Sequence, residues 1–151
     1  MKKILFILLG MAFISSAISC KHENFDERCA REAREYTQKQ CPQQIGEGLT
    51  MDSMTYRTRG KGDNIKDRKF TYYYTFSGEQ DRILNKMLTE YPDTANKRLS
   101  TFKDNVLTAL TNSVQLKTYK DKGFDFEYIY YSDKTKKTVL QFKFTKADYK
   151  H

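Results

Sequence analysis

The sequence has few of the residues, and none of the short motifs, on which most enzymes depend. It contains no tryptophan and only two histidines, and His22 and His151 lie at the two ends of the predicted mature chain. Histidine is the usual proton carrier near neutral pH. No G-x-S-x-G, H-E-x-x-H, P-loop or EF-hand pattern occurs. We therefore expect no catalytic residue, no metal site and no cofactor, and we predict that the protein is not an enzyme.

The sequence also lacks an apolar run long enough to cross a bilayer. Residues 4–14 are almost wholly apolar, but a transmembrane helix needs about 20 such residues. The cationic start at Lys2 and Lys3, the short apolar run and the small residues 15–19 are typical of a secretory signal. The sequence therefore predicts an exported protein.

The signal segment ends in Ala17-Ile18-Ser19-Cys20, which resembles the lipobox of bacterial lipoproteins. Ser19 fits the pattern, whereas Ala17 and Ile18 stand where Leu and then Ala or Ser are usual. The resemblance implies cleavage before Cys20, acylation of its thiol and anchoring in a bacterial cell envelope, with the outer membrane favoured over the inner. An ordinary signal cut, which leaves Cys20 as a free thiol, is the alternative.

Size and charge limit what remains after cleavage. We divide the chain into a signal peptide at residues 1–19, a tether at residues 20–25 and one domain at residues 26–151, which is long enough for a single core. The whole chain has a net charge of +8, and about +6 remains once Lys2 and Lys3 are removed. An exported protein rarely meets nucleic acid, so we expect no nucleic-acid partner. Anionic lipid, anionic glycan and acidic protein are the candidate partners.

Two cysteines remain besides Cys20. An even pair in an exported chain, Cys29 and Cys41, suggests a disulfide. Twelve residues of one continuous helix would separate them by about 18 Å, whereas bonded cysteines need Cα atoms within about 7 Å. Pro42 favours a break at Cys41. Either the chain turns back there and the bond forms, or the two thiols are not partners.

The pattern of apolar residues predicts the secondary structure. A helix over residues 26–36, with a thin stripe at Phe25, Cys29, Ala33 and Tyr36, is ended by Pro42. Further on we predict strands at 49–58 and 69–77 around a loop at 59–68, helices at 77–91 and 93–112, an extended segment at 114–119, and strands at 124–131 and 139–145. The alternation slips between Met51 and Met54, which predicts a β-bulge.

Aromatic side chains alternate along the clearest strands. Phe70, Tyr72, Tyr74 and Phe76 share one face of their strand. This alternation is typical of an antiparallel sheet with one buried and one solvated face. We therefore predict an α+β fold with an N-terminal helix and a central helix pair packed on one face of a four- to five-stranded antiparallel sheet, without a parallel crossover.

The order of elements over residues 24–149 resembles cystatin-like and NTF2-like α+β domains, in which a leading helix packs on a bent antiparallel sheet. The chain as a whole is similar to small bacterial envelope lipoproteins of unknown function. The inserted helix pair departs from the cystatin order, and the resemblance implies no catalytic residue. Asp125 and Glu127, two apart on the face opposite Phe124 and Phe126, are interpreted as solvent-facing charges beside lysines.

Two groups of residues are candidate binding sites. Basic residues bracket the first hairpin loop and predict an anion-binding site, unless they are simply solvated: Arg57, Arg59, Lys61, Lys66, Arg68 and Lys69. Lysines crowd the other hairpin tip, and the two tips would form one basic end if they met in space. Tyr56, Tyr73 and Tyr131 are expected on the open sheet face, where they suit a partner; cover by the first helix or a partner chain is the alternative.

These observations together predict an exported lipoprotein that is held at the lipid bilayer by acylated Cys20. We expect a non-enzymatic binding module for an envelope protein or an anionic glycan. A structural accessory subunit of an envelope complex is one alternative. A small-molecule-binding protein, or an enzyme with an unrecognised site, is the other.

Overall fold

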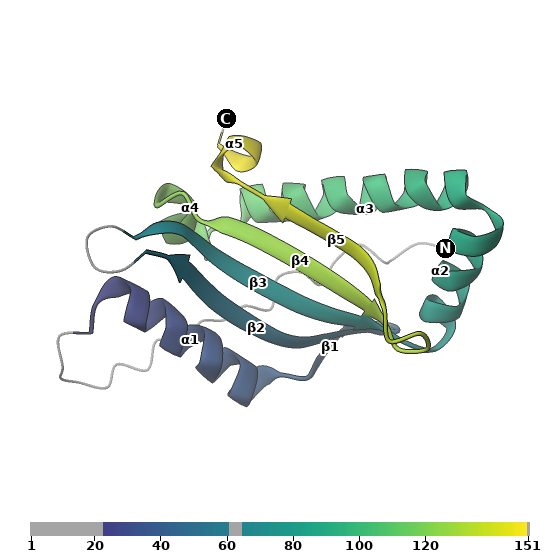
Figure 1. Cartoon of the computed structure of the whole chain (residues 1–151), viewed down its shortest axis with the longest axis horizontal. Coiled ribbons are helices and arrows are strands. Elements are labelled where there is room, and N and C mark those ends of the chain that lie inside the picture. The colour runs from purple at the N-terminus through teal and green to yellow at the C-terminus, as the bar shows by residue number, and fades with distance from the viewer. Residues whose placement is uncertain (1–22, 61–64, 151) are drawn as a thin grey trace.

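The computed structural model describes residues 23–60 and 65–150. Five strands and five helices are assigned within these ranges, so the predicted α+β class is confirmed (Figure 1). In chain order the elements are α1 (Phe25–Gln40), β1 (Gln43–Gly46), β2 (Leu49–Arg59), β3 (Lys66–Phe76), α2 (Gly78–Glu90), α3 (Pro92–Asn112), α4 (Lys117–Asp121), β4 (Asp125–Ser132), β5 (Thr138–Phe144) and α5 (Lys146–Tyr149). Residues 1–22, 61–64 and 151, which include Cys20, Lys61 and both histidines, lie outside the described part.

The sheet is mixed, which corrects the prediction of a purely antiparallel one. Its strand order follows the chain from β1 to β5, and every neighbouring pair is antiparallel except β3 and β4, which run parallel. The helix pair explains the difference. Eleven residues of β3 extend about 36 Å, and the 21 residues of α3 return about 31 Å. The chain therefore re-enters the sheet at the end where β3 began.

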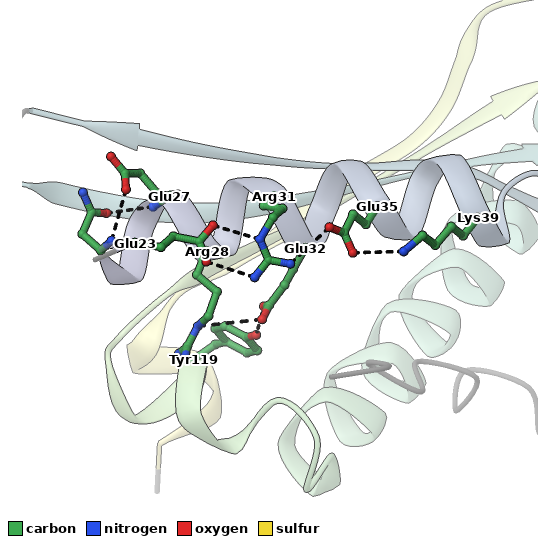
Figure 2. A network of polar contacts seen from close by, with 9 residues as sticks. Glu23, Glu27, Arg28, Arg31, Glu32, Glu35, Lys39 and Tyr119 are labelled. Carbon is green, nitrogen blue, oxygen red and sulfur yellow. Dashed lines mark hydrogen bonds and ion pairs between the residues drawn. The ribbon is translucent and has the colours of Figure 1, made fainter. Parts of the chain in front are cut away.

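The first helix follows local rules closely. Asn24 caps it, accepting from the Glu27 amide at 2.8 Å while Glu27 accepts from the Asn24 amide at 3.1 Å. A row of ion pairs from Glu23 through Arg31 and Glu35 to Lys39 lines its solvent side (Figure 2). The helix ends at Gln40, before Pro42, as predicted, but it begins at Phe25, a residue we had assigned to the tether.

All helices that contribute to the core pack on one face of the sheet, which we call the inner face. The predicted stripe of α1 is confirmed, since Cys29, Ala33 and Tyr36 are buried there. Val106 and Leu110 of α3 join the same cluster. Strands β3, β4 and β5 supply most of its large side chains: Phe70, Tyr72, Tyr74, Phe126, Tyr128, Tyr130, Phe142 and Phe144. The predicted alternation is therefore correct on all three strands.

The structure confirms the predicted β-bulge but contradicts the predicted extended segment at residues 114–119. The bulge is confirmed, because the β2–β3 register shifts between Met51 and Ser53. Residues 114–119 are not extended: they lead into α4, which places Tyr119 against Phe70 with ring centroids 5.0 Å apart. Strand β1 and helix α5 carried no recognisable periodicity because they are four residues long.

Candidate binding surface on the open sheet face

The face of the sheet opposite the core, which we call the outer face, bears polar and half-buried side chains. Strand register fixes its rows. Arg57, Lys69 and Asp125 lie side by side across β2, β3 and β4, and Thr71, Glu127 and Lys143 follow in the next row. The helices that the structure describes pack on the inner face, so none of them covers these rows of the outer face.

Two acidic side chains in these rows, Asp125 and Glu127, are already paired with cations. Lys69 Nζ donates to Glu127 Oε2 at 2.6 Å, and Lys143 Nζ lies 3.1 Å from Asp125 Oδ2. Burial raises the pKa of Glu127, but hydrogen bonds from Lys69 and Gln141 more than offset it, and the pKa lies below its ordinary value. Asp125 and Glu127 are therefore ion-pair partners of lysines on the face opposite Phe126, in agreement with their interpretation from the sequence.

A shallow open depression lies at the hairpin end of the outer face. Its lining holds four cations and two carboxylates: Arg57, Thr58, Arg59, Asp67, Lys69, Asp125 and Lys143. Arg59 forms an ion pair with Asp67. Arg57 is exposed and has no acidic partner among the described residues, so it is the cation here that is available to an incoming anion.

Only part of the predicted basic cluster faces this depression. Arg57, Arg59 and Lys69 line it, whereas Arg68 turns to the other side of the sheet and is held by Asp26, with Nε–Oδ1 and Nη2–Oδ2 distances of 2.7 and 3.1 Å. Lys66 is exposed at the start of β3 but does not line the depression. The hydrogen-bonded Arg68 lowers the pKa of Asp26 below its ordinary value, and the Tyr56 hydroxyl, which also donates to it, adds to this.

The three tyrosines predicted to share the open face do not do so. Tyr56 pairs with Phe70 and packs against Phe124 at 5.8 Å, on the inner face. Its position follows from the β2 bulge, because one extra residue reverses the alternation. Tyr73 and Tyr131 are half-buried on the outer face, where Tyr73 lies beside Ile129.

The two basic hairpin tips lie at opposite ends of the molecule, so they cannot form one basic end (Figure 1). The parallel β3–β4 pairing is the reason, since it places the β2–β3 and β4–β5 turns at different ends. The second tip is held by Asp81 of α2, which is 2% exposed and accepts from the Lys134 amide at 2.9 Å and the Asn85 side chain at 2.7 Å. Its turn therefore serves the packing of α2.

The structure does not join the predicted cysteine pair. Cys29 and Cys41 are both free thiols, with Cys29 buried under α1 and Cys41 half-buried at the end of that helix. Burial and the nearby Glu32 and Asp26 carboxylates raise the pKa of Cys29 to about 12, so its thiol is protonated at neutral pH. Cys20 and the predicted signal cleavage site lie outside the described residues.

Residues 23–60 and 65–150 contain neither a cluster of metal-binding side chains nor a membrane-spanning helix. No group of three or more histidine, cysteine, aspartate or glutamate side chains is placed to hold a metal ion. No helix there has the length and apolar character needed to span a bilayer.

Comparisons with known proteins give a family and a fold. A family model described as a domain of unknown function, DUF8479, matches residues 24–141. A crystal structure of a Pseudomonas aeruginosa protein that is predicted to be secreted superposes with a TM-score of 0.53 at 11% identity, covering 86% of this chain and 98% of that chain. At this identity the likeness shows a shared fold alone. No curated protein matches the chain.

Proposed function

This chain belongs to the family of the domain of unknown function DUF8479, and we propose that it is an exported, lipid-anchored binding protein that holds an anionic glycan on its outer sheet face. The signal-type segment supports export, and the structural neighbour is itself predicted to be secreted. Cys20 supports the anchor, because acylation with more than one chain gives stable membrane attachment. Globomycin should cause the unprocessed precursor to accumulate, and radiolabelled palmitate should label the mature protein. A soluble, unlabelled mature chain would refute the anchor.

One observation carries the glycan proposal: an exposed guanidinium, with no acidic partner among the described residues, lies in a depression whose carboxylates already form ion pairs. Arg57 supplies that guanidinium, and its two parallel N–H donors match carboxylate and sulfate groups. Lys69 and Lys143 form ion pairs with Glu127 and Asp125, so both carboxylates are already occupied. An anion entering here therefore meets excess positive charge without displacing a lysine.

Aromatic side chains extend the same face beyond the depression. Tyr73 and Tyr131 are half-buried, so part of each ring remains in contact with solvent. A phenol ring offers an apolar surface and a hydroxyl to a sugar. The strip formed by Tyr73, Ile129 and Tyr131 also suits a protein contact, and an acidic envelope protein is therefore the second candidate partner.

Binding of the mature protein to polygalacturonate tests the proposal, with neutral dextran as the control polymer. The Arg57→Glu variant should bind polygalacturonate three- to tenfold more weakly, because an exposed ion pair contributes up to about 1 kcal/mol and the reversal adds repulsion. Binding should also weaken as salt rises. Arg98→Glu makes the same charge change on exposed α3 and should alter affinity less than twofold.

Equal losses in the two variants would mean that net charge alone drives binding, and would refute the site. Retained binding in Arg57→Glu would do the same. Capture of a stoichiometric acidic envelope protein, with no polygalacturonate affinity, would select the second candidate.

A further inference from the structure

Buried tyrosines on the inner side of the sheet divide into two groups. Those at the margin of the core each donate their hydroxyl to a partner. Tyr149 donates to the Phe124 carbonyl at 2.6 Å, Tyr119 to Glu32 at 2.8 Å and Tyr36 to Gln43 at 3.1 Å. Tyr56 donates to Asp26. The fold therefore provides acceptors wherever a marginal tyrosine needs one.

The second group lies at the centre of the sheet, and we call it the tyrosine array: Tyr72, Tyr74, Tyr128 and Tyr130. All four are at most 5% exposed. None of these hydroxyls forms a hydrogen bond with any residue in the described part of the chain, and the Tyr72 oxygen is itself fully buried without a partner. The other such buried side-chain oxygen among the described residues is that of Thr55, on the outer face.

Parallel pairing of β3 with β4 gives the tyrosine array a regular geometry. Tyr72 lies beside Tyr128 and Tyr74 beside Tyr130. The rings of each pair are stacked, with centroids 5.1 and 4.8 Å apart. Successive pairs are separated by about 7 Å along the strands. The four phenol rings therefore form two adjacent stacked pairs on the inner face of the sheet.

Phenylalanine would place the same ring at these positions without burying a hydroxyl. It does so at Phe70 and Phe126 in the next row, and at Phe142 and Phe144 on β5. A buried hydroxyl without an acceptor destabilises the fold by about 1–3 kcal/mol. The Tyr72 hydroxyl carries this cost in full, because its oxygen is the one in the array that is fully buried without a partner. Hydrogen-bond acceptors from a bound molecule would remove that cost.

The surroundings of the tyrosine array determine which kind of molecule fits. Burial, and then the neighbouring tyrosines, raise the pKa values of Tyr72, Tyr74 and Tyr130 well above the ordinary value, and burial alone raises that of Tyr128. No charged side chain contributes to these shifts. A charged ligand group would therefore be buried without a counter-ion, which is strongly unfavourable. The fitting molecule is neutral.

The helices sit to either side of the tyrosine array. Helix α1 packs on β2 through the small side chains of Cys29 and Ala33, and α3 runs along β5 and α5 (Figure 1). Strands β3 and β4, which bear the array, lie between these two contacts. A molecule that separated α1 from α3 would contact aromatic rings and meet the hydroxyls of the array.

We infer that the tyrosine array is the floor of an inner binding site for a neutral apolar molecule with carbonyl or ether oxygens, and an acyl ester is the class that fits. Its acyl chain contacts the rings, and its ester oxygens accept from the phenols. This site lies on the face opposite the proposed glycan surface and does not depend on that proposal.

Titration of the mature protein with 1,2-dioctanoylglycerol tests the inference. Because the chain has no tryptophan, its intrinsic fluorescence comes from its 11 tyrosines, four of which form the array. Thermal unfolding gives a second readout, which does not depend on the array tyrosines as fluorophores. Wild-type protein should show saturable binding and a higher Tm. The Y72F/Y74F/Y128F/Y130F variant keeps every ring and should bind at least tenfold more weakly, since each lost hydrogen bond weakens binding several-fold.

Two control variants and one control ligand make the result specific. Tyr91→Phe changes a tyrosine that is 57% exposed and should bind as wild type, and Arg57→Glu should do so as well. Octanoate, a charged analogue, should bind at least tenfold more weakly than the diacylglycerol, because no cation among the described residues acts on the array tyrosines.

Absence of saturable dioctanoylglycerol binding by wild-type protein would overturn the inference. So would a quadruple variant with affinity within twofold of wild type, or octanoate that binds as tightly as the neutral ester. If the quadruple variant does not fold, Y72F alone replaces it, with a threefold or greater loss of affinity as the expected result.

Discussion

Replacement of Tyr72 by phenylalanine should stabilise the protein in the absence of ligand. The substitution removes the one array hydroxyl whose oxygen is fully buried without a partner and leaves the ring stacked on Tyr128 at 5.1 Å. Most core substitutions destabilise a protein. An increase in stability would therefore be direct evidence that this hydroxyl has no acceptor within the folded chain.

The expected size follows from the state of that hydroxyl. An unsatisfied buried donor destabilises the folded state by about 1–3 kcal/mol. Its removal recovers this free energy, but the small cavity left by the oxygen destabilises the variant and reduces the gain. A net gain of about 1 kcal/mol is expected, which raises Tm by about 3–5 °C for a domain of this size. Tyr149→Phe provides the matched control. Its hydroxyl donates to the Phe124 carbonyl at 2.6 Å, so its loss should cost about 1–2 kcal/mol.

Urea denaturation followed by far-ultraviolet circular dichroism measures both variants. Protein refolded from urea should be used, so that any bound lipid has been removed. A gain for Tyr72→Phe and a loss for Tyr149→Phe support the assignment of the two hydroxyls. A loss of 1 kcal/mol or more in Tyr72→Phe would refute it, because it would show that the hydroxyl is satisfied inside the apo fold.

Two further predictions concern the carboxylates of Asp26, which is half-buried, and Asp81, which is buried. The pKa of Asp26 is lowered in the folded protein, chiefly by the hydrogen bond from Arg68, so the ionised carboxylate stabilises the fold above its ordinary pKa near 3.8 and this stabilisation is lost as pH falls toward the lowered value. The urea midpoints at pH 7 and pH 3 should therefore differ less in Asp26→Asn than in wild type. An equal difference in the two proteins would contradict the pairing of Asp26 with Arg68. Asp81→Ala should cost about 2–4 kcal/mol in urea unfolding, because the Lys134 amide and the Asn85 side chain lose a buried acceptor. Asp133→Ala, exposed on the same turn, should cost less than about 0.5 kcal/mol, and similar losses in both would show that Asp81 has no special role.

Local chemistry was sufficient to predict the main elements. The helix that precedes Pro42 and the alternation from Phe70 to Phe76 follow from backbone sterics and two-residue periodicity, which act over a few neighbouring residues. Short elements such as β1 and α5 are too brief to show a period. They form because neighbouring strands and helices supply their partners.

Tertiary structure decided which predicted site residues come together. The basic residues 57–69 are contiguous in sequence, but strand alternation sends Arg68 to Asp26 on the inner face and Arg57 to the outer depression. Lys143 lies far along the chain, and only strand pairing brings it to that depression. The prediction for Tyr56 is wrong because the β-bulge between Met51 and Ser53 reverses the alternation of every later residue in β2, and so turns Tyr56 to the inner face.

The sequence by itself determined the α+β class, the aromatic character of the core and the expectation of export, because each depends on composition or on short-range periodicity. Only the tertiary structure decided the parallel pairing of β3 with β4, and with it the opposite placement of the basic tips and the array of Tyr72, Tyr74, Tyr128 and Tyr130. Strand direction depends on where a long helix returns the chain. No local pattern in β3 or β4 records that path.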